Sequence, residues 1–237
     1  MNTPTTLVCF PFAGSGASFF RPWRRGVGEG ATVLPVQLPG REQRLDEPLL
    51  LDVAEAIDAL APDLLRQVEG ARDVVVFGHS LGAMLAYEFA RRLEPRPDRA
   101  VRLVVSGSPA PDRPRVRRAG GLPDEAFLKQ VGEFAAYSHE ALDDPEMREM
   151  LLPILRADVR MHESYVPRGP LALAHAVTCL RGRDDTLVAA DDARDWARLA
   201  RGNFDYLELP GGHMYLADSA EALIRLLVGR AAATERA

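Results

Sequence analysis

Residues 78–82 read Gly-His-Ser-Leu-Gly, so a serine stands between two glycines. A serine hydroxyl attacks a carbonyl carbon only when a nearby base removes its proton, and an acidic residue must orient that base. The pentapeptide follows the strand-like run 73–77 and opens the largely apolar helical stretch 81–93, which predicts a sharp turn between a buried strand and a helix. Such a turn would present Ser80 as a nucleophile, and a side chain at either glycine would collide with neighbouring backbone.

His213 is the histidine whose place in the chain suits a base for Ser80. It lies in the glycine-rich segment 209–213, directly after the last predicted strand. In enzymes with a strand-turn-helix nucleophile, the chain order is serine, acid, histidine. The other histidines lie in the pentapeptide, in a helical stretch or at the start of a strand, at His79, His139, His162 and His175. We therefore predict that His213 is the general base.

Three aspartates follow predicted strands and could orient this histidine. Asp184 and Asp185 follow one strand, and Asp112 follows the strand before it. Neighbouring residues of an extended loop point in opposite directions, so only one of Asp184 and Asp185 can face His213. The residues by themselves leave the choice of acid open.

Short β-branched runs alternate with longer amphipathic stretches along the chain. The runs predict strands at 5–10, 31–36, 73–78, 101–107, 176–182 and 204–210. Apolar residues at helical spacing predict a helix over 52–68, which Pro62 should kink or split, and a last helix opened by Asp218 and Glu221. Strands that alternate with helices predict a mostly parallel, doubly wound α/β sheet.

The segment 111–170 interrupts this alternation. It has no convincing strand but two helical patches, at 122–134 and 145–165. Because it lies between two strands, it would extend above the carboxyl edge of the sheet, where loops build binding sites. We predict a helical lid at about 111–170, inserted in a single domain that covers 1–237.

Composition narrows the classes of partner. The net charge of −5 gives no general electrostatic reason to expect nucleic acid or an anionic membrane. No apolar run approaches the length that crosses a membrane. Two isolated cysteines, Cys9 and Cys179, predict buried free thiols rather than a disulfide or a metal site. We expect a cytoplasmic protein that needs no metal and no cofactor.

The sequence resembles the type II thioesterases that accompany modular polyketide synthases and nonribosomal peptide synthetases. The resemblance runs in order through nearly the whole chain, in the stretches 7–23, 36–49, 75–88, 151–165, 180–188 and 209–216. It is therefore much more specific than the serine pentapeptide alone, and it implies the α/β-hydrolase fold.

The resemblance also implies which aspartate is the acid. In that family the loop after the penultimate strand usually reads GDxDPxV, and its second aspartate completes the catalytic triad. Laid on residues 182–188, which read GRDDTLV, the pattern selects Asp185 and departs from the family at Arg183 and Thr186. Thioesterases embedded in synthases take their acid after the earlier strand, which keeps Asp112 as the alternative.

An oxyanion hole is implied in the same way. The first strand runs into FPFAGSGAS where the family usually has FPHAGG, so Phe12 replaces a histidine and Ser15 a glycine. By resemblance, the backbone N–H groups of Ala13 and Leu81 would hold the oxyanion of a tetrahedral intermediate. We expect the hole to survive both replacements because backbone groups form it.

The implied reaction is hydrolysis of an acyl thioester on the phosphopantetheine arm of an acyl or peptidyl carrier protein, which clears stalled or aberrant acyl units. The alternatives are a dedicated product-releasing thioesterase, a free-standing serine esterase and a non-catalytic binding protein of the same fold. Carrier proteins are typically acidic, as this chain is, so docking needs a local basic face. One candidate is the arginine cluster Arg113, Arg115, Arg117 and Arg118.

Overall fold

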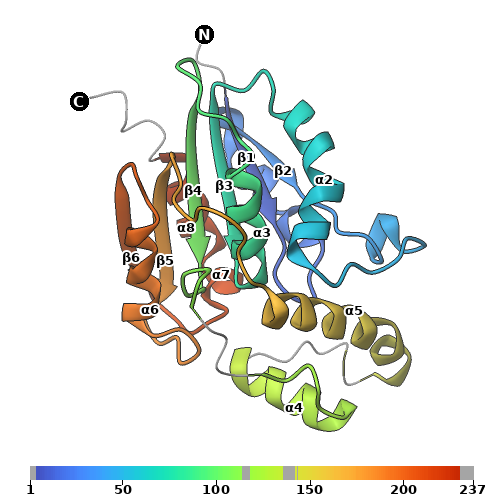
Figure 1. Cartoon of the computed structure of the whole chain (residues 1–237). Helices are drawn as coiled ribbons and strands as arrows, with labels where there is room; N and C mark the ends of the chain where they lie inside the picture. The colour runs from blue at the N-terminus through green and yellow to red at the C-terminus, as the bar shows by residue number, and fades with distance from the viewer. Residues whose placement is uncertain (1–3, 114–117, 136–141, 143, 230–237) are drawn as a thin grey trace.

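A parallel sheet forms the centre of the computed structural model, which describes residues 4–113, 118–135, 142 and 144–229. Its six strands lie in the order β2-β1-β3-β4-β5-β6 (Figure 1). They are β1 Thr5–Phe10, β2 Ala31–Pro35, β3 Asp73–His79, β4 Ala100–Ser106, β5 Ala176–Gly182 and β6 Phe204–Leu209. Each strand agrees with its prediction to within one residue at either end.

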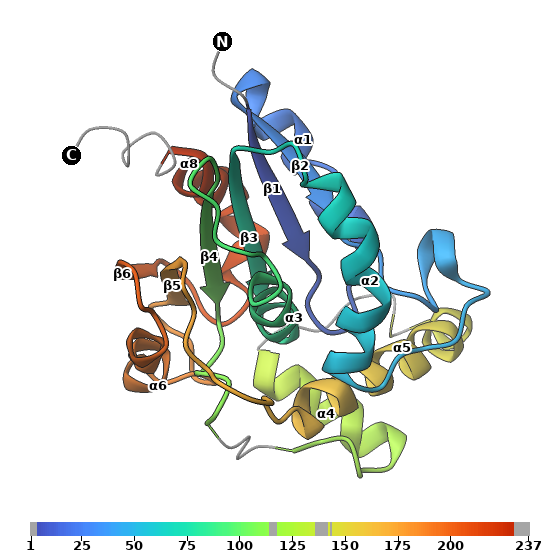
Figure 2. The same cartoon turned by 45° about the horizontal axis from the view of Figure 1, so that its top comes forward.

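Helices cover both faces of this sheet, as the alternating pattern predicts. They are α1 Trp23–Gly26, α2 Val53–Gln67, α3 Leu81–Ala90, α4 Asp124–Ala135, α5 Pro145–Ser164, α6 Ala190–Arg194, α7 Tyr215–Asp218 and α8 Ala220–Gly229. Short 3-10 helices are η1 Ala17–Phe20, η2 Gly28–Gly30, η3 Glu42–Arg44 and η5 Asp195–Arg198. Figures 1 and 2 show α2 and α3 on one face and α8 on the other.

The two faces are packed by alternate residues of the same strands. Val76 of β3 lies in a buried cluster with Ile57 of α2 and residues of α3. Its neighbour Val75 lies in a second buried cluster with Trp23 of α1 and Leu223 of α8. Because successive side chains of a strand point to opposite faces, both layers of helices are held by one set of apolar strands. The doubly wound α/β prediction is confirmed.

α2 differs from its prediction. Asp52 caps the helix by accepting hydrogen bonds from the N–H groups of Ala54 and Glu55, at 2.8 and 3.0 Å. The helix runs unsplit to Gln67 with Pro62 inside it, so of the two effects expected of the proline, a kink or a split, the split does not occur. Burial of one apolar side against the sheet outweighs the backbone hydrogen bond that a proline removes. The buried residues are Val53, Ala56, Ile57, Leu60, Ala61 and Leu64.

The last helix also begins later than predicted. Leu223 donates its N–H to the carbonyl oxygen of Ser219 at 3.0 Å, and α8 starts at Ala220. Asp218 instead ends the short helix α7. With Asp218 as its cap the helix would begin at Ser219, so the shift is one residue, which is within the usual uncertainty of helix ends read from a sequence pattern.

The predicted helical patches between β4 and β5 are present as α4 and α5. Both lie beyond the carboxyl ends of the strands, where the arrowheads point in Figure 1. Phe127 of α4 and Leu155 of α5 share a small buried cluster, and the Arg156 guanidinium lies 4.3 Å from the centre of the Phe127 ring. The two helices are therefore packed on each other at the edge of the sheet that also carries the serine turn. That they act as a lid inside a single domain stays a prediction.

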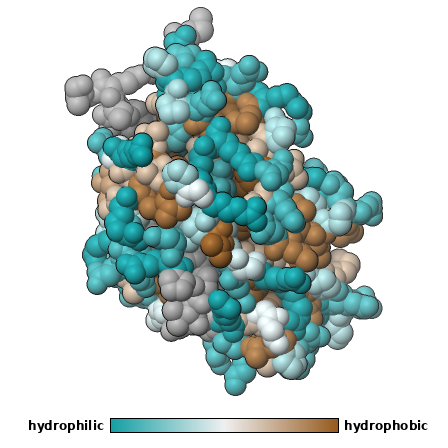
Figure 3. Space-filling model, in the orientation of Figure 1, coloured by the Kyte–Doolittle hydropathy of each residue, from teal (hydrophilic) through white to brown (hydrophobic). Residues whose placement is uncertain are grey.

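The face of the molecule seen in Figure 3 is largely polar. Figure 3 shows one face on which hydrophilic side chains dominate and hydrophobic ones gather in separate patches. None of the described helices is long and apolar enough to cross a membrane.

Candidate active site

Ser80 occupies a strained turn between β3 and α3. Its φ of 53° and ψ of −117° place a non-glycine residue in a region that L-residues rarely adopt. The backbone closes so tightly there that a Cβ at Gly78 would overlap Gly82, and one at Gly82 would lie 2.5 Å from the carbonyl oxygen of Phe10. Both glycines are therefore required by close backbone approach, as the sequence predicts. The Ser80 N–H donates to the carbonyl oxygen of Ser106 at 2.9 Å, which fixes the turn to β4.

Asp185 and His213 form a buried pair at the same edge of the sheet. His213 Nδ1 lies 2.9 Å from Asp185 Oδ2, and the two residues are only 5 and 4% exposed. The other carboxylate oxygen of Asp185 accepts hydrogen bonds from the N–H groups of Leu187 and Val188, at 2.8 and 3.0 Å. The carboxylate is thus held on both oxygens, and it fixes the orientation of the imidazole ring.

These hydrogen bonds also set the charge of Asp185. Burial by itself would raise the pKa of the carboxyl group, but the hydrogen bond and charge of His213, with the N–H groups of Val188 and Leu187, outweigh it. The pKa of Asp185 therefore lies below its ordinary value, and the group is ionised at neutral pH.

The other two predicted aspartates lie elsewhere. Asp184 is exposed on the surface, although it neighbours Asp185 in the chain. Asp112 accepts hydrogen bonds from the two terminal nitrogens of Arg198, at 3.2 and 3.1 Å. Of the three candidates, the structure brings only Asp185 to His213.

His213 lies close to the serine turn without a hydrogen bond to it. A Cβ placed on Gly107, the residue after Ser106, would be 3.1 Å from Cε1 of His213. Since Ser106 binds the Ser80 backbone, the His213 imidazole and the serine turn both lie near the ends of β3 and β4. No hydrogen bond joins the His213 ring to the Ser80 hydroxyl within the described residues; in serine enzymes without substrate this contact is often long.

Two backbone N–H groups beside Ser80 are unused. Phe10 of β1 lies opposite Gly78 of β3 in the sheet, so the loop after β1 runs beside the serine turn. In this loop Ser15 donates its N–H to Phe12, and Gly14 donates its N–H to Asp158 at 2.8 Å. The N–H groups of Ala13 and Leu81 donate to no protein group among the described residues. The two donors implied by the family resemblance are therefore available for a ligand.

A second imidazole lies behind His213 and was missed as part of this site. His79 is fully buried, and its Nδ1 lies 2.9 Å from the Ser106 hydroxyl, which is 2.6 Å from the hydroxyl of Tyr215. Burial, and the positive charge that His213 would carry, lower the pKa of His79 well below its ordinary value. His79 is therefore neutral. Ser106 and Tyr215 lie 109 residues apart, so no local pattern indicates the network.

His175 has a structural partner. Its Nε2 lies 2.8 Å from the carbonyl oxygen of Leu93, away from the serine turn. His139 lies outside the described residues, so its predicted place in the helical segment is untested.

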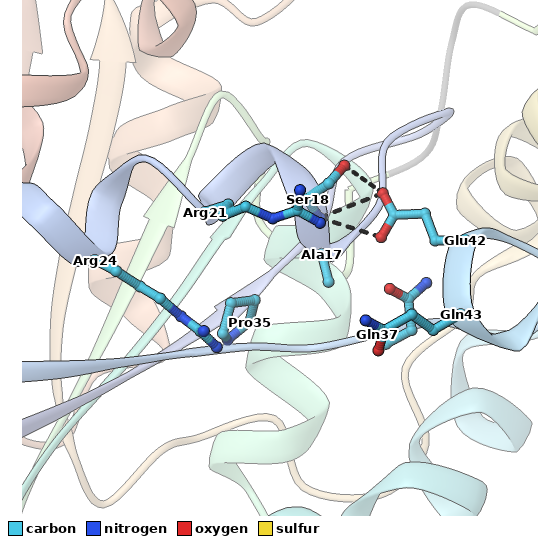
Figure 4. A pocket seen from close by; sticks show the side chains of 8 residues that line it. All are labelled: Ala17, Ser18, Arg21, Arg24, Pro35, Gln37, Glu42 and Gln43. Atoms are coloured by element: carbon cyan, nitrogen blue, oxygen red, sulfur yellow. Dashed lines mark hydrogen bonds between the residues drawn. The ribbon is translucent and has the colours of Figure 1, made fainter.

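A pocket lies next to the loop after β1 (Figure 4). Glu42 accepts hydrogen bonds from the backbone and hydroxyl of Ser18 on one side of it, and the aliphatic side of Pro35 lies on the other. Its remaining lining is Ala17, Arg21, Arg24, Gln37 and Gln43. It shares no residue with the Asp185–His213 pair or the serine turn. Among the described residues, no group of three or more His, Cys, Asp or Glu side chains is placed to hold a metal ion.

The predicted arginine cluster is only partly described. Arg115 and Arg117 lie outside the described residues. Arg113 forms an ion pair with Asp195, and Arg118 is exposed.

Comparison with known proteins gives one family. Residues 5–229 match the family model described as the thioesterase domain. The chain is 35% identical to Thioesterase PikA5 of Streptomyces venezuelae, over 92% of this chain and 77% of that protein. It is also 35% identical to a probable cadicidin biosynthesis thioesterase of Streptomyces griseus, over 92% of this chain, and it spans only 60% of that relative's length.

A solved structure agrees along almost the entire chain. The type II thioesterase BorB from the borrelidin biosynthetic cluster superimposes with a TM-score of 0.85 at 33% identity, covering 97% of this chain and 93% of BorB. The chain thus belongs to the thioesterase family and is a hydrolase with the α/β-hydrolase fold.

Proposed function

We propose that this protein is a type II thioesterase that removes stalled or aberrant acyl units from carrier proteins of a polyketide synthase or nonribosomal peptide synthetase. The observation that carries the proposal is the buried 2.9 Å contact between Asp185 and His213 beside the strained Ser80 turn. The similarity to BorB over nearly the whole of both chains supports the editing type of thioesterase. The substrate is an acyl group on a phosphopantetheine arm.

Ser80 is the nucleophile in this proposal. His213 takes the hydroxyl proton at Nε2, and Ser80 Oγ attacks the thioester carbonyl carbon. The oxyanion that forms accepts hydrogen bonds from the N–H groups of Ala13 and Leu81. His213 then returns the proton to the departing sulfur. A thiol has a pKa of about 8.5 and leaves readily, so this step asks little of the acid.

The second half of the reaction releases the acid. Water enters, His213 removes one of its protons, and the resulting hydroxide attacks the acyl-Ser80 ester. The same two N–H groups hold the second oxyanion, and Ser80 leaves with the proton from His213. Asp185 stays ionised throughout, because its pKa is depressed, and it stabilises the imidazolium in both halves.

We further infer that α4 and α5 form the chamber that holds the acyl chain, and that the protein acts in the cytoplasm. The helices support the first inference because they pack over the carboxyl ends of the strands (Figure 1). Both cysteines support the second, since Cys9 and Cys179 are buried and free and a reducing compartment keeps thiols in that state.

The experiment is a hydrolysis panel. Carrier proteins loaded with acyl groups of different length are incubated with the enzyme, and kcat/KM is compared with that for a p-nitrophenyl ester of the same acid. We expect several short and medium acyl groups to be released from the carrier with higher kcat/KM than from the aryl ester. Strong preference for one long acyl chain would indicate a product-releasing enzyme, and faster turnover of the aryl ester would indicate a free-standing esterase. An inactive wild-type protein would overturn the proposal.

A further inference from the structure

A buried ion pair connects α5 to the segment that follows β2. Arg41 is 4% exposed, and Asp158 of α5 is fully buried. Two guanidinium nitrogens of Arg41 donate to the two carboxylate oxygens of Asp158, at 2.6 and 2.7 Å. The two residues lie 117 positions apart in the chain, so the contact holds together segments that share no local structure.

The remaining hydrogen bonds of the pair go to the loop after β1. Asp158 Oδ2 accepts the N–H of Gly14 at 2.8 Å. Arg41 Nη1 donates to the carbonyl oxygen of Ser15 at 2.9 Å. Asp158 thus binds the backbone N–H of Gly14, and Arg41 binds the carbonyl oxygen of the next residue, Ser15. Ala13, which offers its N–H to the oxyanion, directly precedes the residue that Asp158 holds.

α5 also touches this loop by packing. Gly14 has a φ of +77°, and a Cβ there would lie 3.0 Å from Cδ1 of Leu155, one turn before Asp158 on α5. The Gly14 N–H is donated to Asp158, and the preceding N–H, that of Ala13, has no protein acceptor in the described part of the chain. The helix, the ion pair and the loop therefore form one unit.

Stability alone does not account for this pair. Two charges removed from water lose hydration that their mutual attraction roughly balances, and apolar residues of similar size often replace such pairs without loss. Here the lost hydration outweighs the attraction further, because the Nε of Arg41 is buried without a hydrogen-bond partner among the described residues. What an apolar pair would not supply is an acceptor for Gly14 and a donor for Ser15.

We propose that Arg41 and Asp158 are positioning residues that hold the loop after β1 so that the Ala13 N–H points at the oxyanion. The inference rests on the proposed function. It has a further consequence: the oxyanion hole is complete only while α5 is packed against the loop, so the position of this helix controls the hydrolytic step as well as the shape of the chamber.

The test uses the double variant Arg41→Met/Asp158→Leu in the full chain. It removes both charges together, so we expect the Tm to stay within about 5 °C of wild type. Loss of one donor of an oxyanion hole costs about 10²–10³-fold in kcat, so we expect a fall of about 10²-fold for an acyl thioester with KM changed less than about threefold. An alkyl boronic acid, whose adduct with the serine puts an oxygen in the hole, should lose affinity by the same factor as kcat/KM.

Two further variants separate positioning from simple stability. Tyr165→Phe removes a partly buried hydrogen bond from the Tyr165 hydroxyl to Glu88, at 2.6 Å, next to the end of α5 and away from the loop. It should lower the Tm and leave kcat and boronate affinity at the wild-type values. Arg41→Lys keeps the positive charge but cannot make the two parallel hydrogen bonds to Asp158. It should lower kcat by about tenfold with KM unchanged. If the double variant does not fold, this variant tests the proposed positioning role.

The outcomes are distinct from those of the proposed function. A wild-type enzyme that neither hydrolyses acyl thioesters nor binds the boronate would remove the proposed function, and this inference with it. If the wild type is active, the inference is overturned by a folded double variant whose kcat stays within threefold of the wild-type value. If the double variant does not fold, the same result for Arg41→Lys overturns it. It is also overturned by a fall in kcat without a matching fall in boronate affinity.

Discussion

The imidazole rings of His79 and His213 lie 4.8 Å apart between their centres, with their planes inclined by 49°. His79 is fully buried, and His213 is 5% exposed. A protonated His79 would place a second positive charge beside the imidazolium that His213 becomes in the proposed reaction. The buried His79 ring is neutral, and its neutrality lowers the free energy of unfolding at low pH.

The first prediction concerns stability against pH. The pKa of His79 is depressed in the folded protein, so below its ordinary pKa of 6.5 the unfolded chain binds a proton that the folded protein does not. The free energy of unfolding therefore falls as pH drops below about 6.5, by at most about 1.4 kcal/mol per pH unit from this group. The pKa of Asp185 is also depressed, so this group stabilises the folded protein at pH values above its ordinary pKa of 3.8. That stabilisation is lost only as the pH falls below 3.8.

The measurement is thermal unfolding between about pH 5 and 8, the range in which histidine titrates. His79→Asn keeps a hydrogen-bonding group opposite Ser106 but does not titrate. We expect its Tm to change less over this range than the Tm of the wild type. Equal slopes for the two proteins would show that His79 is not the titrating group.

Ser80→Ala should fold normally and lose activity. Its backbone hydrogen bond to Ser106 does not involve the side chain, so the turn is retained. We expect kcat for an acyl thioester to fall by roughly 10⁶-fold. Mass spectrometry after treatment with a serine-directed phosphonate should find the label on Ser80 in the wild type and none in the variant. A label on another residue would disprove the assignment of the nucleophile.

Asp185→Asn should reduce kcat by about 10⁴-fold, because an amide disturbs the tautomer of His213 and cannot stabilise its charge. Two aspartates of the same chain serve as controls. Asp184→Asn changes an exposed neighbour, and Asp112→Asn changes the partner of Arg198. Both should keep kcat within about twofold. A large loss at Asp112 with little loss at Asp185 would reverse the assignment of the acid.

The basic cluster predicts the salt dependence of carrier docking. Arg115→Glu/Arg118→Glu should lower kcat/KM for an acyl carrier protein and flatten its dependence on ionic strength, because screened long-range attraction is removed. Hydrolysis of a small acyl thioester should not change. Arg66→Glu/Arg225→Glu, at exposed positions of α2 and α8, makes the same change of net charge. If this control weakens carrier turnover equally, net charge rather than the cluster governs docking.

Features set by neighbouring residues were predictable from the sequence. The six strands follow from β-branched runs, and the serine turn follows from two glycines at fixed spacing between a strand and a helix. Pro62 shows the limit of this reasoning, because a local rule disfavours proline in a helix and only the packed face of α2 overrides it. The strand pattern left the choice of acid open, the family resemblance selected Asp185 with Asp112 as the alternative, and the folded geometry brings Asp185 to His213.

Long-range polar contacts were not predictable. Arg41 and Asp158 lie in stretches that resemble the family. The resemblance singles out both segments but does not indicate that these two residues contact each other. Nothing in the spacing of two charged residues 117 positions apart indicates that they are buried together. The His79–Ser106–Tyr215 network could not be predicted for the same reason, because its members come from three distant segments.

The place of β1 in the sheet affects how the chain folds during synthesis. β1 lies between β2 and β3, and the Thr5 hydroxyl donates to Asp73 at 2.6 Å across 68 residues. Both neighbours of β1 are therefore made after it, and at about 5–20 residues per second the first strand waits several seconds for β3. Parallel pairing across such a separation is slow compared with helix formation. The backbone on which the serine turn rests is consequently assembled only after a third of the chain has left the ribosome.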